Sequence, residues 1–287
     1  MKTMLKIPLW VNKYKYDYKS VSDIPAERFE EINKKLEKLT KGEPEVSIVI
    51  GAWNEEVNIF KNISSLADMK TKYSVEIIVI NNNSTDGTQK TLDQLKVRNY
   101  FQPIQGWGPA RQMGLEQSKG KYIFLADADC IYPSCWVDEM MKELAKPDVS
   151  CVYGRYSFIP EKGYPRWKLF MLERLKDFIS EIRHVKRPYL NAYGISMGYV
   201  KEYGLKIGHI MTMFRGDDGK MCFDLMKYGK IKQIKADKAR AWTGPRTLQR
   251  DGSFSKALWS RIIMESKKMA SFFTAHKPHD TKNVAGE

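Results

Sequence analysis

Short apolar runs alternate with helix-length segments along residues 45–130. The runs are continuous instead of alternating with polar residues, which is typical of strands buried on both faces. Strands separated by helices of about a dozen residues predict an α/β fold with a mostly parallel, doubly wound sheet and helices on both faces. We expect strands at residues 46–50, 75–80, 100–101 and 121–126, and helices that end near residues 69, 95 and 119.

The regions on either side have different patterns. Residues 1–44 are polar and rich in lysine, and they carry a tyrosine cluster and one helical patch. We expect this region to be an N-terminal extension that packs on the main domain. Its helix is marked by apolar residues at helical spacing, namely Phe29, Ile32, Leu36 and Leu39.

After residue 130 the regular alternation ends. We expect a short helix at 136–144, a strand at 149–158 and a long amphipathic helix at 165–185. The apolar stripe of the long helix is expected to be core or interface, and it comprises Leu172, Leu175, Phe178, Ile179, Ile182 and Val185.

The pattern of the last region, residues 251–287, predicts a basic amphipathic helix followed by a loose tail. Apolar residues such as Phe254, Leu258 and Ile262 recur at helical spacing, with lysine and arginine between them. A helix of this kind either lies on a membrane surface or packs as an ordinary terminal helix.

The charge balance restricts the partners. The 287 residues include 48 Lys and Arg against 34 Asp and Glu, a net charge of +14. Nucleic acid, an anionic membrane surface or phosphorylated small molecules are all compatible with this excess. No nucleic acid is expected, because the lysines are spread along the chain without an arginine-rich arm or a binding motif.

Two further features concern the compartment. No apolar run approaches the roughly 18 residues that span a bilayer, and the N-terminus lacks an apolar leader, so we expect a cytoplasmic protein. The four cysteines have no zinc-site spacing, so we expect them to be reduced structural thiols: Cys130, Cys135, Cys151 and Cys222.

The most informative chemistry follows the apolar run at 121–126. Asp127 and Asp129 stand two residues apart, so in an extended chain their side chains point to the same side. Hard carboxylate oxygens suit Mg²⁺ or Mn²⁺, which keeps positions open for phosphate oxygens. The alternative for an isolated Asp-x-Asp is a solvated loop where a strand ends.

Other polar loops follow the other predicted strands. GAWNEE (51–56) follows the first strand, NNNSTDGT (81–88) follows the second, and GPARQMG (108–114) opens the helix that precedes the aspartate pair. In a parallel sheet of this kind, ligands bind in the crevice beyond the carboxyl ends of the strands. All of these loops are therefore expected at one edge.

This order of motifs resembles the nucleotide-sugar half of family 2 glycosyltransferases, the inverting enzymes of GT-A fold. The resemblance covers about residues 45–245. It implies a nucleotide-sugar-binding half at 45–130 and an acceptor-binding and catalytic half at 131–250. It also extends to RGDDG (215–219), where family members carry an acidic pair before a helix. Acidic residues in a first helical turn also complement the helix dipole, which is the structural alternative.

The resemblance implies roles for individual residues. Asp218 corresponds to the general base and Asp217 to its acidic neighbour near the acceptor. Asp129 is the first metal ligand, with Asp127 near the ribose or the ion's water shell. Arg111 either lies near the nucleotide or caps a surface helix. The donor nucleotide site is expected to comprise Ala52, Trp53, which stacks on the base, Asn54, Glu55, Asn82, Ser84, Arg111 and Asp127.

The sequence departs from the family pattern at two places. Asn82 stands where some members have an aspartate that contacts the base, which leaves UDP, GDP and dTDP open. Many GT-A enzymes offer a histidine metal ligand after the base, but residues 241–246 contain none.

We therefore predict an inverting transferase that moves a sugar from a nucleoside diphosphate sugar to a hydroxyl acceptor, assisted by Mn²⁺ or Mg²⁺. The basic charge favours an acceptor at a membrane, such as a lipid-linked glycan or a cell-envelope polysaccharide under assembly at the inner membrane face. The rival hypotheses are a sugar nucleotidyltransferase, a basic binding protein and a catalytically inactive scaffold of the same fold.

Overall fold

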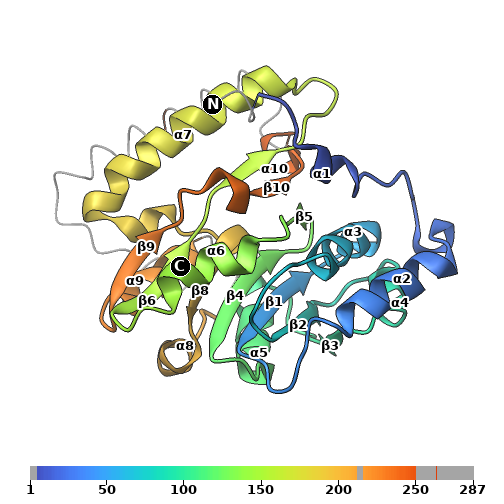
Figure 1. The fold of residues 1–287 in the computed structure, drawn as a ribbon, viewed down its shortest axis with the longest axis horizontal. Helices are drawn as coiled ribbons and strands as arrows, with labels where there is room; N and C mark the ends of the chain where they lie inside the picture. Colours follow the sequence, from blue (N-terminus) through green and yellow to red (C-terminus); the bar gives the residue numbers. More distant parts are fainter. Residues whose placement is uncertain (1–4, 212–215, 250–262, 264–287) are drawn as a thin grey trace.

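The computed structural model describes residues 5–211, 216–249 and 263. A central sheet of seven strands has the order β3-β2-β1-β4-β8-β6-β9 (Figure 1). β1 pairs in parallel with both β2 and β4, whereas β8 runs antiparallel to its neighbours β4 and β6. The strands are β1 (Val46–Ala52), β2 (Val75–Asn81), β3 (Arg98–Phe101), β4 (Tyr122–Asp127), β6 (Val149–Tyr153), β8 (Met197–Val200) and β9 (Lys230–Gln233).

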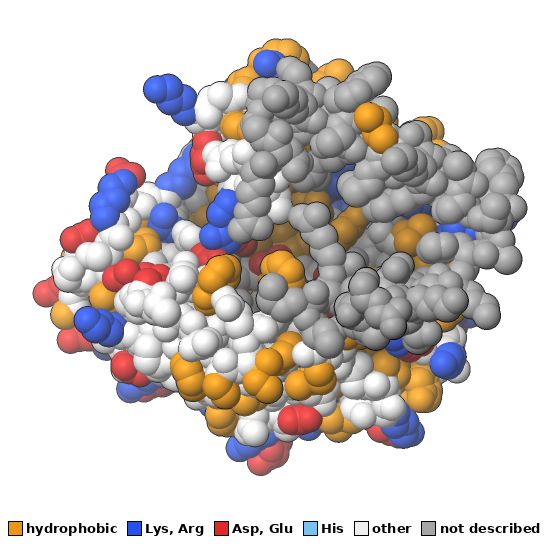
Figure 2. Space-filling view, turned by 180° about the vertical axis from the view of Figure 1, so that it is seen from behind, with side chains coloured by type: hydrophobic (Ala, Val, Ile, Leu, Met, Phe, Trp, Pro, Cys, Tyr) orange, Lys and Arg blue, Asp and Glu red, His pale blue; other side chains and the backbone are white. Residues whose placement is uncertain are grey.

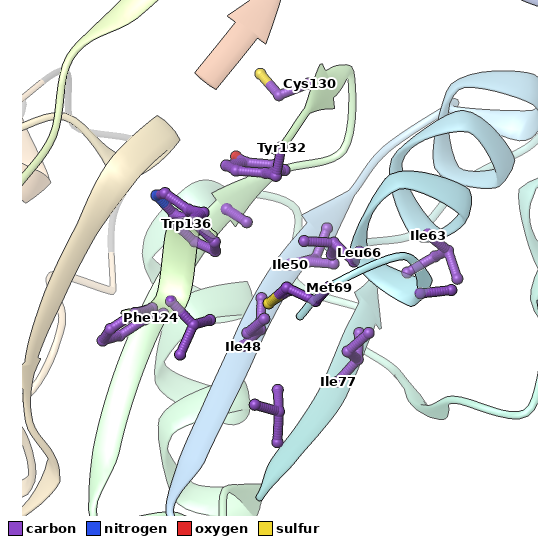
Figure 3. Packing of buried hydrophobic residues seen from close by; sticks show 14 of the residues in the cluster. Ile48, Ile50, Ile63, Leu66, Met69, Ile77, Phe124, Cys130, Tyr132 and Trp136 are labelled. Atoms are coloured by element: carbon purple, nitrogen blue, oxygen red, sulfur yellow. The ribbon is translucent and has the colours of Figure 1, made fainter. Parts of the chain in front are cut away.

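Helices cover both faces of this sheet because successive strand residues point to opposite sides. Ile48 and Ile50 of β1 belong to the cluster that α2, α3 and α6 complete, whereas Val49 packs with Leu115 of α5 on the other face. Figure 3 shows Ile63 and Leu66 of α3 beside Ile48, Ile50 and Ile77 of the strands, with Phe124 and Trp136 nearby. The helices around the sheet are α2 (Ala26–Leu36), α3 (Glu56–Ala67), α4 (Thr88–Leu92), α5 (Trp107–Gln117), α6 (Trp136–Leu144), α8 (Lys201–Ile207) and α9 (Asp217–Leu225).

A second sheet of three strands has the order β5-β10-β7 and was not predicted. Its strands are β5 (Cys130–Ile131), β7 (Tyr156–Phe158) and β10 (Ala241–Thr243). The prediction of a single strand at 149–158 was wrong, because this segment divides into β6 and β7, which join different sheets. Gly154 lies at the division, where its N–H donates to Ser196 O and a Cβ would collide with the Ser196 side chain. Strand propensity is a property of the segment and cannot tell which sheet it joins.

The N-terminal extension has more structure than the one helix expected. Besides α2, it forms α1 (Leu9–Asn12) and the 3₁₀ turn η1 (Val21–Asp23). Tyr16 and Tyr18 pack on Phe60 of α3, with ring centroids 5.6 and 6.1 Å away. Val11 and Tyr14 belong to a cluster with residues of β5 and β10, so the extension contacts both sheets.

The long helix α7 (Arg166–Lys186) confirms the predicted amphipathic helix, but its apolar stripe does not enter the core. Leu172 is buried, whereas Leu175, Phe178, Ile182 and Val185 are exposed. Short 3₁₀ turns follow at η2 (Pro188–Asn191), η3 (Gly194–Ser196) and η4 (Asp237–Ala239), and the last helix is α10 (Arg246–Gln249).

The helix predicted within 251–287 lies outside the described residues, apart from Ile263. Within the described part of the chain, no helix combines the length and the apolar character that crossing a bilayer requires.

Candidate active site

The loops that follow β1, β2 and β4 meet at one edge of the central sheet, because these parallel strands end on the same side. Viewed from behind, Figure 2 shows acidic side chains near the centre of the face, in a hollow beside hydrophobic and basic side chains. Two acidic pairs occupy this region, one at the end of β4 and the other at the start of α9.

Hydrogen bonds fasten the first two loops to each other. Asn54 has a φ of 54°, in the left-handed region that asparagine tolerates better than most residues. Its backbone N–H donates to Ser84 Oγ at 3.0 Å, and its side-chain oxygen accepts from the N–H of Thr85 at 2.8 Å. The N–H of Glu55 donates to Thr88 Oγ1 at 2.8 Å. Residues 52–55 and 84–88 thus form one continuous wall.

Trp53 and Asn82 differ in what they offer to a ligand on that wall. The Trp53 side chain, at the end of β1, is 52% exposed. Asn82 is buried: its Nδ2 donates to Ile104 O and its Oδ1 accepts from Gly106 N, both at 2.7 Å. Both ends of the Asn82 amide therefore hold the loop after β3 in place.

The turn that carries Asp127 and Asp129 is fixed by two buried residues that the sequence did not single out. Asn62 of α3 donates to the carbonyls of Asp127 and Cys130, at 3.0 and 2.9 Å. The Tyr132 hydroxyl accepts from the N–H of Asp127 at 3.0 Å and donates to Ile195 O at 2.8 Å. Both carboxylates consequently project from a rigid turn.

Asp127, Asp129 and Cys130 place one potential ligand atom each within 4.8 Å of one another. Burial, followed by the charge of Asp129, raises the pKa of Asp127 to about 7. Burial also raises the pKa of Cys130 far above its usual value, so this residue is a neutral thiol. The donor set is therefore two hard carboxylates, one of them with a raised pKa, which fits a divalent cation such as Mg²⁺ or Mn²⁺.

Arg246 of α10 contacts this pair and was missed by the sequence analysis. Its Nη2 lies 2.6 Å from Glu55 Oε1 and 2.7 Å from Asp129 Oδ2. The pairing of β10 with β5 brings Arg246 here, since Thr243 stands opposite Cys130 in that ladder. Burial opposes the charge of Arg246, but Glu55 and Asp129 raise its pKa above the ordinary value. Residues 241–246 contain no histidine, but they end with an arginine that reaches Asp129.

The second acidic pair is held by Arg111 of α5. Its Nη1 lies 2.6 Å from Asp218 Oδ1 and 3.2 Å from Asp217 Oδ2. Burial alone would lower the pKa of the guanidinium, but Asp218, Asp217 and Asp127 raise it. The alternative of Arg111 as a surface cap is wrong, because its side chain is only 12% exposed and joins both acids.

Asp217 and Asp218 have different surroundings. Asp217 is buried and also accepts from His209 Nδ1 at 2.9 Å and from the N–H of Ile210 at 3.1 Å. Burial would raise its pKa, yet His209 and Arg111 lower it well below the usual range. The Asp218 side chain is 19% exposed and forms an ion pair with Arg111. Asp217 therefore faces the protein, whereas Asp218 is the acid that retains solvent contact.

His209 and Gly194 complete this arrangement. His209 was not singled out from the sequence, whereas the small-residue segment that contains Gly194 was expected to let a ligand approach the backbone closely. His209 lies in a segment without a recognisable motif, so no local signal marked it. Gly194 belongs to the small-residue segment 191–198, and a Cβ there would collide with the Arg111 guanidinium and touch Asp218. The absence of a side chain at Gly194 thus leaves room for Arg111, which contacts Asp217 and Asp218.

Comparison with known proteins gives one family and one fold. The model of "Glycosyl transferase family 2" matches residues 47–203, more than half of the chain. The glycosyltransferase AglE of Haloferax volcanii is 29% identical over 155 residues, which are 50% of each protein. An uncharacterized glycosyltransferase of Haemophilus influenzae is 34% identical over 119 residues, 39% of this chain and 36% of the relative. The chain thus spans half or less of the length of these relatives.

Solved structures share the fold at low sequence identity. A mannosyltransferase of Pyrobaculum calidifontis, PcManGT, solved with GDP-Man and Mn²⁺, gives a TM-score of 0.52 at 15% identity. That match covers 82% of this chain and 70% of the other. Residues 1–349 of S. aureus TarS with UDP-GlcNAc give a TM-score of 0.52 at 16% identity, covering 70% and 58% of the two chains. Both are GT-A glycosyltransferases, and the central sheet described above is of the same type.

Proposed function

Since the chain belongs to glycosyl transferase family 2, we propose that it transfers a sugar from a nucleoside diphosphate sugar to an acceptor hydroxyl, with inversion at the anomeric carbon. The observation that supports this most is the meeting of two unlike acidic pairs at one sheet edge. Asp127 has a pKa raised by burial and by Asp129, which favours binding of a cation, whereas Asp217 and Asp218 already share Arg111.

Residues 45–130 form the donor half in this proposal. Trp53 stacks on the base through its exposed ring, and Ala52, Asn54, Glu55 and Ser84 shape the wall beside it. We now assign Asn82 to holding the loop after β3, because both ends of its amide are bonded there. The nucleobase of the donor is left to experiment, since one similar structure contains a GDP sugar and another contains a UDP sugar.

A divalent cation would be held by Asp129 and Asp127. When bound, it supplies positive charge to the diphosphate as the leaving group departs. The donor set supports this assignment, because two hard carboxylates converge and one of them has a pKa raised by burial and by the other.

Arg246 gives the same carboxylates a positive neighbour from the protein itself. It contacts Asp129 and Glu55 directly, and its side chain is 48% exposed. We propose that Arg246 leaves Asp129 when donor and cation bind and turns its guanidinium toward the diphosphate. A guanidinium binds phosphate oxygens in the same forked geometry as carboxylates.

Asp218 acts as the general base. Its Oδ1 is held by Arg111, which leaves Oδ2 to accept the proton of the acceptor hydroxyl. The acceptor oxygen forms a bond to the anomeric carbon while the bond from that carbon to the diphosphate oxygen breaks. Asp217 contacts no substrate in this scheme; it keeps Arg111 and the start of α9 in position through His209 and Ile210.

The acceptor half is residues 131–250, and we propose a glycan or lipid-linked acceptor presented at a membrane. The support is the net charge of +14, because each basic residue near an anionic surface adds about 1 kcal/mol of attraction. AglE and the Haemophilus influenzae relative are named as glycosyltransferases, which agrees with the class of reaction.

The test is release of nucleoside diphosphate from UDP, GDP and dTDP sugars with Mn²⁺ or Mg²⁺, in wild type and Asp218→Asn. We expect release with one base, and a loss in the variant. Pyrophosphate formation from a nucleoside triphosphate and a sugar phosphate would instead identify a nucleotidyltransferase. Absence of release from every donor, in a folded protein with acceptor extracts present, would support an inactive scaffold.

A further inference from the structure

The outward face of α7 carries large apolar side chains that an ordinary surface helix would direct toward the core. Six large apolar side chains point outward, and Met171, Phe178 and Val185 are 66%, 65% and 80% exposed. At about 100° per residue, the spacing of the six confines them to an arc of roughly 80°. We call this set the α7 apolar stripe, and it consists of Trp167, Met171, Leu175, Phe178, Ile182 and Val185.

The inward face of α7 carries three buried charged residues beside Leu169 and Leu172. Glu173 is fully buried, pairs with Arg166 Nη1 at 2.6 Å, and accepts from the N–H of Phe158 at 2.8 Å. Asp177 is 2% exposed and pairs with Arg240 Nη2 at 2.6 Å. Turning the stripe inward would break these buried ion pairs and leave charges without partners. The outward direction of the apolar stripe is therefore fixed by the fold.

The stripe residues follow one another at intervals of three or four along one side of α7, unlike scattered exposed apolar residues, which need no explanation. From Trp167 to Val185 it extends about 27 Å along the helix, at about 1.5 Å per residue. We propose that the α7 apolar stripe docks on the surface of an anionic lipid bilayer, with the helix lying in the plane of the interface.

Charge around the stripe favours this occupant. Arg174 and Lys186 of α7 and Lys162 just before it are exposed. The acids of α7 are neutralised, since Glu173 and Asp177 are buried in ion pairs and Glu181 pairs with Arg155 at 2.5 Å and Lys235 at 3.3 Å. Basic residues beside an apolar helix face are the pattern of interfacial membrane helices. A second copy of the chain would bring the same positive surface against itself, which disfavours a dimer through this face.

The position of α7 connects this surface to the candidate site. Figure 1 shows α7 along one edge of the molecule, beyond β10 and α10 and away from β1–β3. The chain then continues through η2 to Gly194, which lies against Arg111 and Asp218. A bilayer on α7 would thus lie on the acceptor side, where a lipid-linked acceptor could reach Asp218. This last role rests on the proposed function, whereas the binding itself does not.

The experiment is co-sedimentation of the full chain with vesicles of equimolar phosphatidylglycerol and phosphatidylcholine, and with phosphatidylcholine alone. The double variant Phe178→Ser/Val185→Ser removes two stripe residues. Its matched control, Leu205→Ser/Met226→Ser, removes two apolar residues that are 47% and 41% exposed elsewhere. We expect wild type and control to pellet with the anionic vesicles, and the stripe variant to bind at least about tenfold more weakly.

Three results would overturn the proposal. The first is equal pelleting of the stripe variant and wild type. The second is a wild-type dimer, seen by sedimentation equilibrium, that is lost in the stripe variant. The third is a lower melting temperature of the stripe variant without loss of pelleting. The last would assign the stripe to residues of the same chain beyond 249. If wild type releases nucleoside diphosphate but does not pellet, only the proposal of membrane docking is contradicted. If it pellets but releases no nucleoside diphosphate, only the proposed function is contradicted.

Discussion

The two acidic pairs of the site have opposite electrostatic surroundings. After β4, burial and the charge of Asp129 raise the pKa of Asp127 to about 7, although Arg246 contacts Asp129. At the start of α9, Asp217 is buried, yet His209 and Arg111 lower its pKa far below the usual range. The comparison teaches that burial alone does not define a role. Asp127, whose pKa is raised, is suited to bind a cation, whereas Asp217 and Asp218, which share Arg111, are suited to hold a general base rigidly.

The largest effect should come from Asp218→Asn. The substitution removes the proton acceptor but keeps the shape of the side chain. Turnover should fall by about 10²–10⁴, the range of general-base catalysis, while nucleotide binding stays near wild type. Nucleoside diphosphate release under saturating donor measures this. A folded variant with near wild-type turnover would remove Asp218 from the role of base.

Asp217→Asn should affect folding more than binding. It breaks a buried network with Arg111 and His209, and breaking such pairs costs about 3–5 kcal/mol of the free energy of unfolding. Urea unfolding measures the loss. The matched control is Asp224→Asn on the same helix, whose partner Lys220 is a surface residue and whose loss should be at most about 1 kcal/mol. Equal losses in both variants would contradict the assigned difference.

The same variant gives a pH prediction. The pKa of Asp217 is lower in the folded state than in the unfolded chain, so its contribution to stability is present above the ordinary aspartate pKa near 3.8 and is lost as pH falls through the folded value. The gap between wild type and Asp217→Asn in free energy of unfolding should therefore narrow from pH 5 to pH 3. A gap that widens over this interval would contradict the depressed pKa.

The smallest effect should come from Arg246→Ala. Arg246 competes with a cation for Asp129, so its removal should tighten Mn²⁺ binding without nucleotide, measured by titration calorimetry. Because the arginine is half exposed, the gain should be only about two- to fivefold. Nucleoside diphosphate should bind more weakly in the same variant. Arg246→Lys keeps the charge, so its Mn²⁺ affinity and its nucleoside diphosphate affinity should both be close to those of wild type. Unchanged Mn²⁺ affinity in Arg246→Ala would show that Arg246 does not compete with the cation for Asp129.

The sequence predicted the donor side of the fold well because local pattern determines it. Buried parallel strands are continuous apolar runs, so β1, β2 and β4 were predicted close to their observed bounds, and the carboxylates Asp127 and Asp129 follow directly from the end of β4. Long-range pairing decided the rest. Arg246 reaches Asp129 only because β10 pairs with β5, and His209 reaches Asp217 through a segment without a motif.

The α7 helix gives a second example of what the sequence pattern alone could not predict. Its periodicity revealed the apolar stripe, but periodicity cannot tell which side of a helix faces the core. That direction is decided by Glu173 and Asp177, whose partners include Arg240, more than 60 residues away. An apolar face pointing outward was therefore invisible in the sequence alone.

The most direct test of the account is the thermal stability of wild type, Asp129→Ala and Asp218→Asn with UDP, GDP and dTDP, each with and without Mn²⁺. A ligand at 100 times its dissociation constant adds about 2.7 kcal/mol, which is visible as a shift in melting temperature. The account predicts a Mn²⁺-dependent shift with one nucleotide that disappears in Asp129→Ala and persists in Asp218→Asn. A shift that persists in Asp129→Ala, or one that disappears in a folded Asp218→Asn, would contradict the account, in which the first acidic pair binds the cation and the second holds the general base.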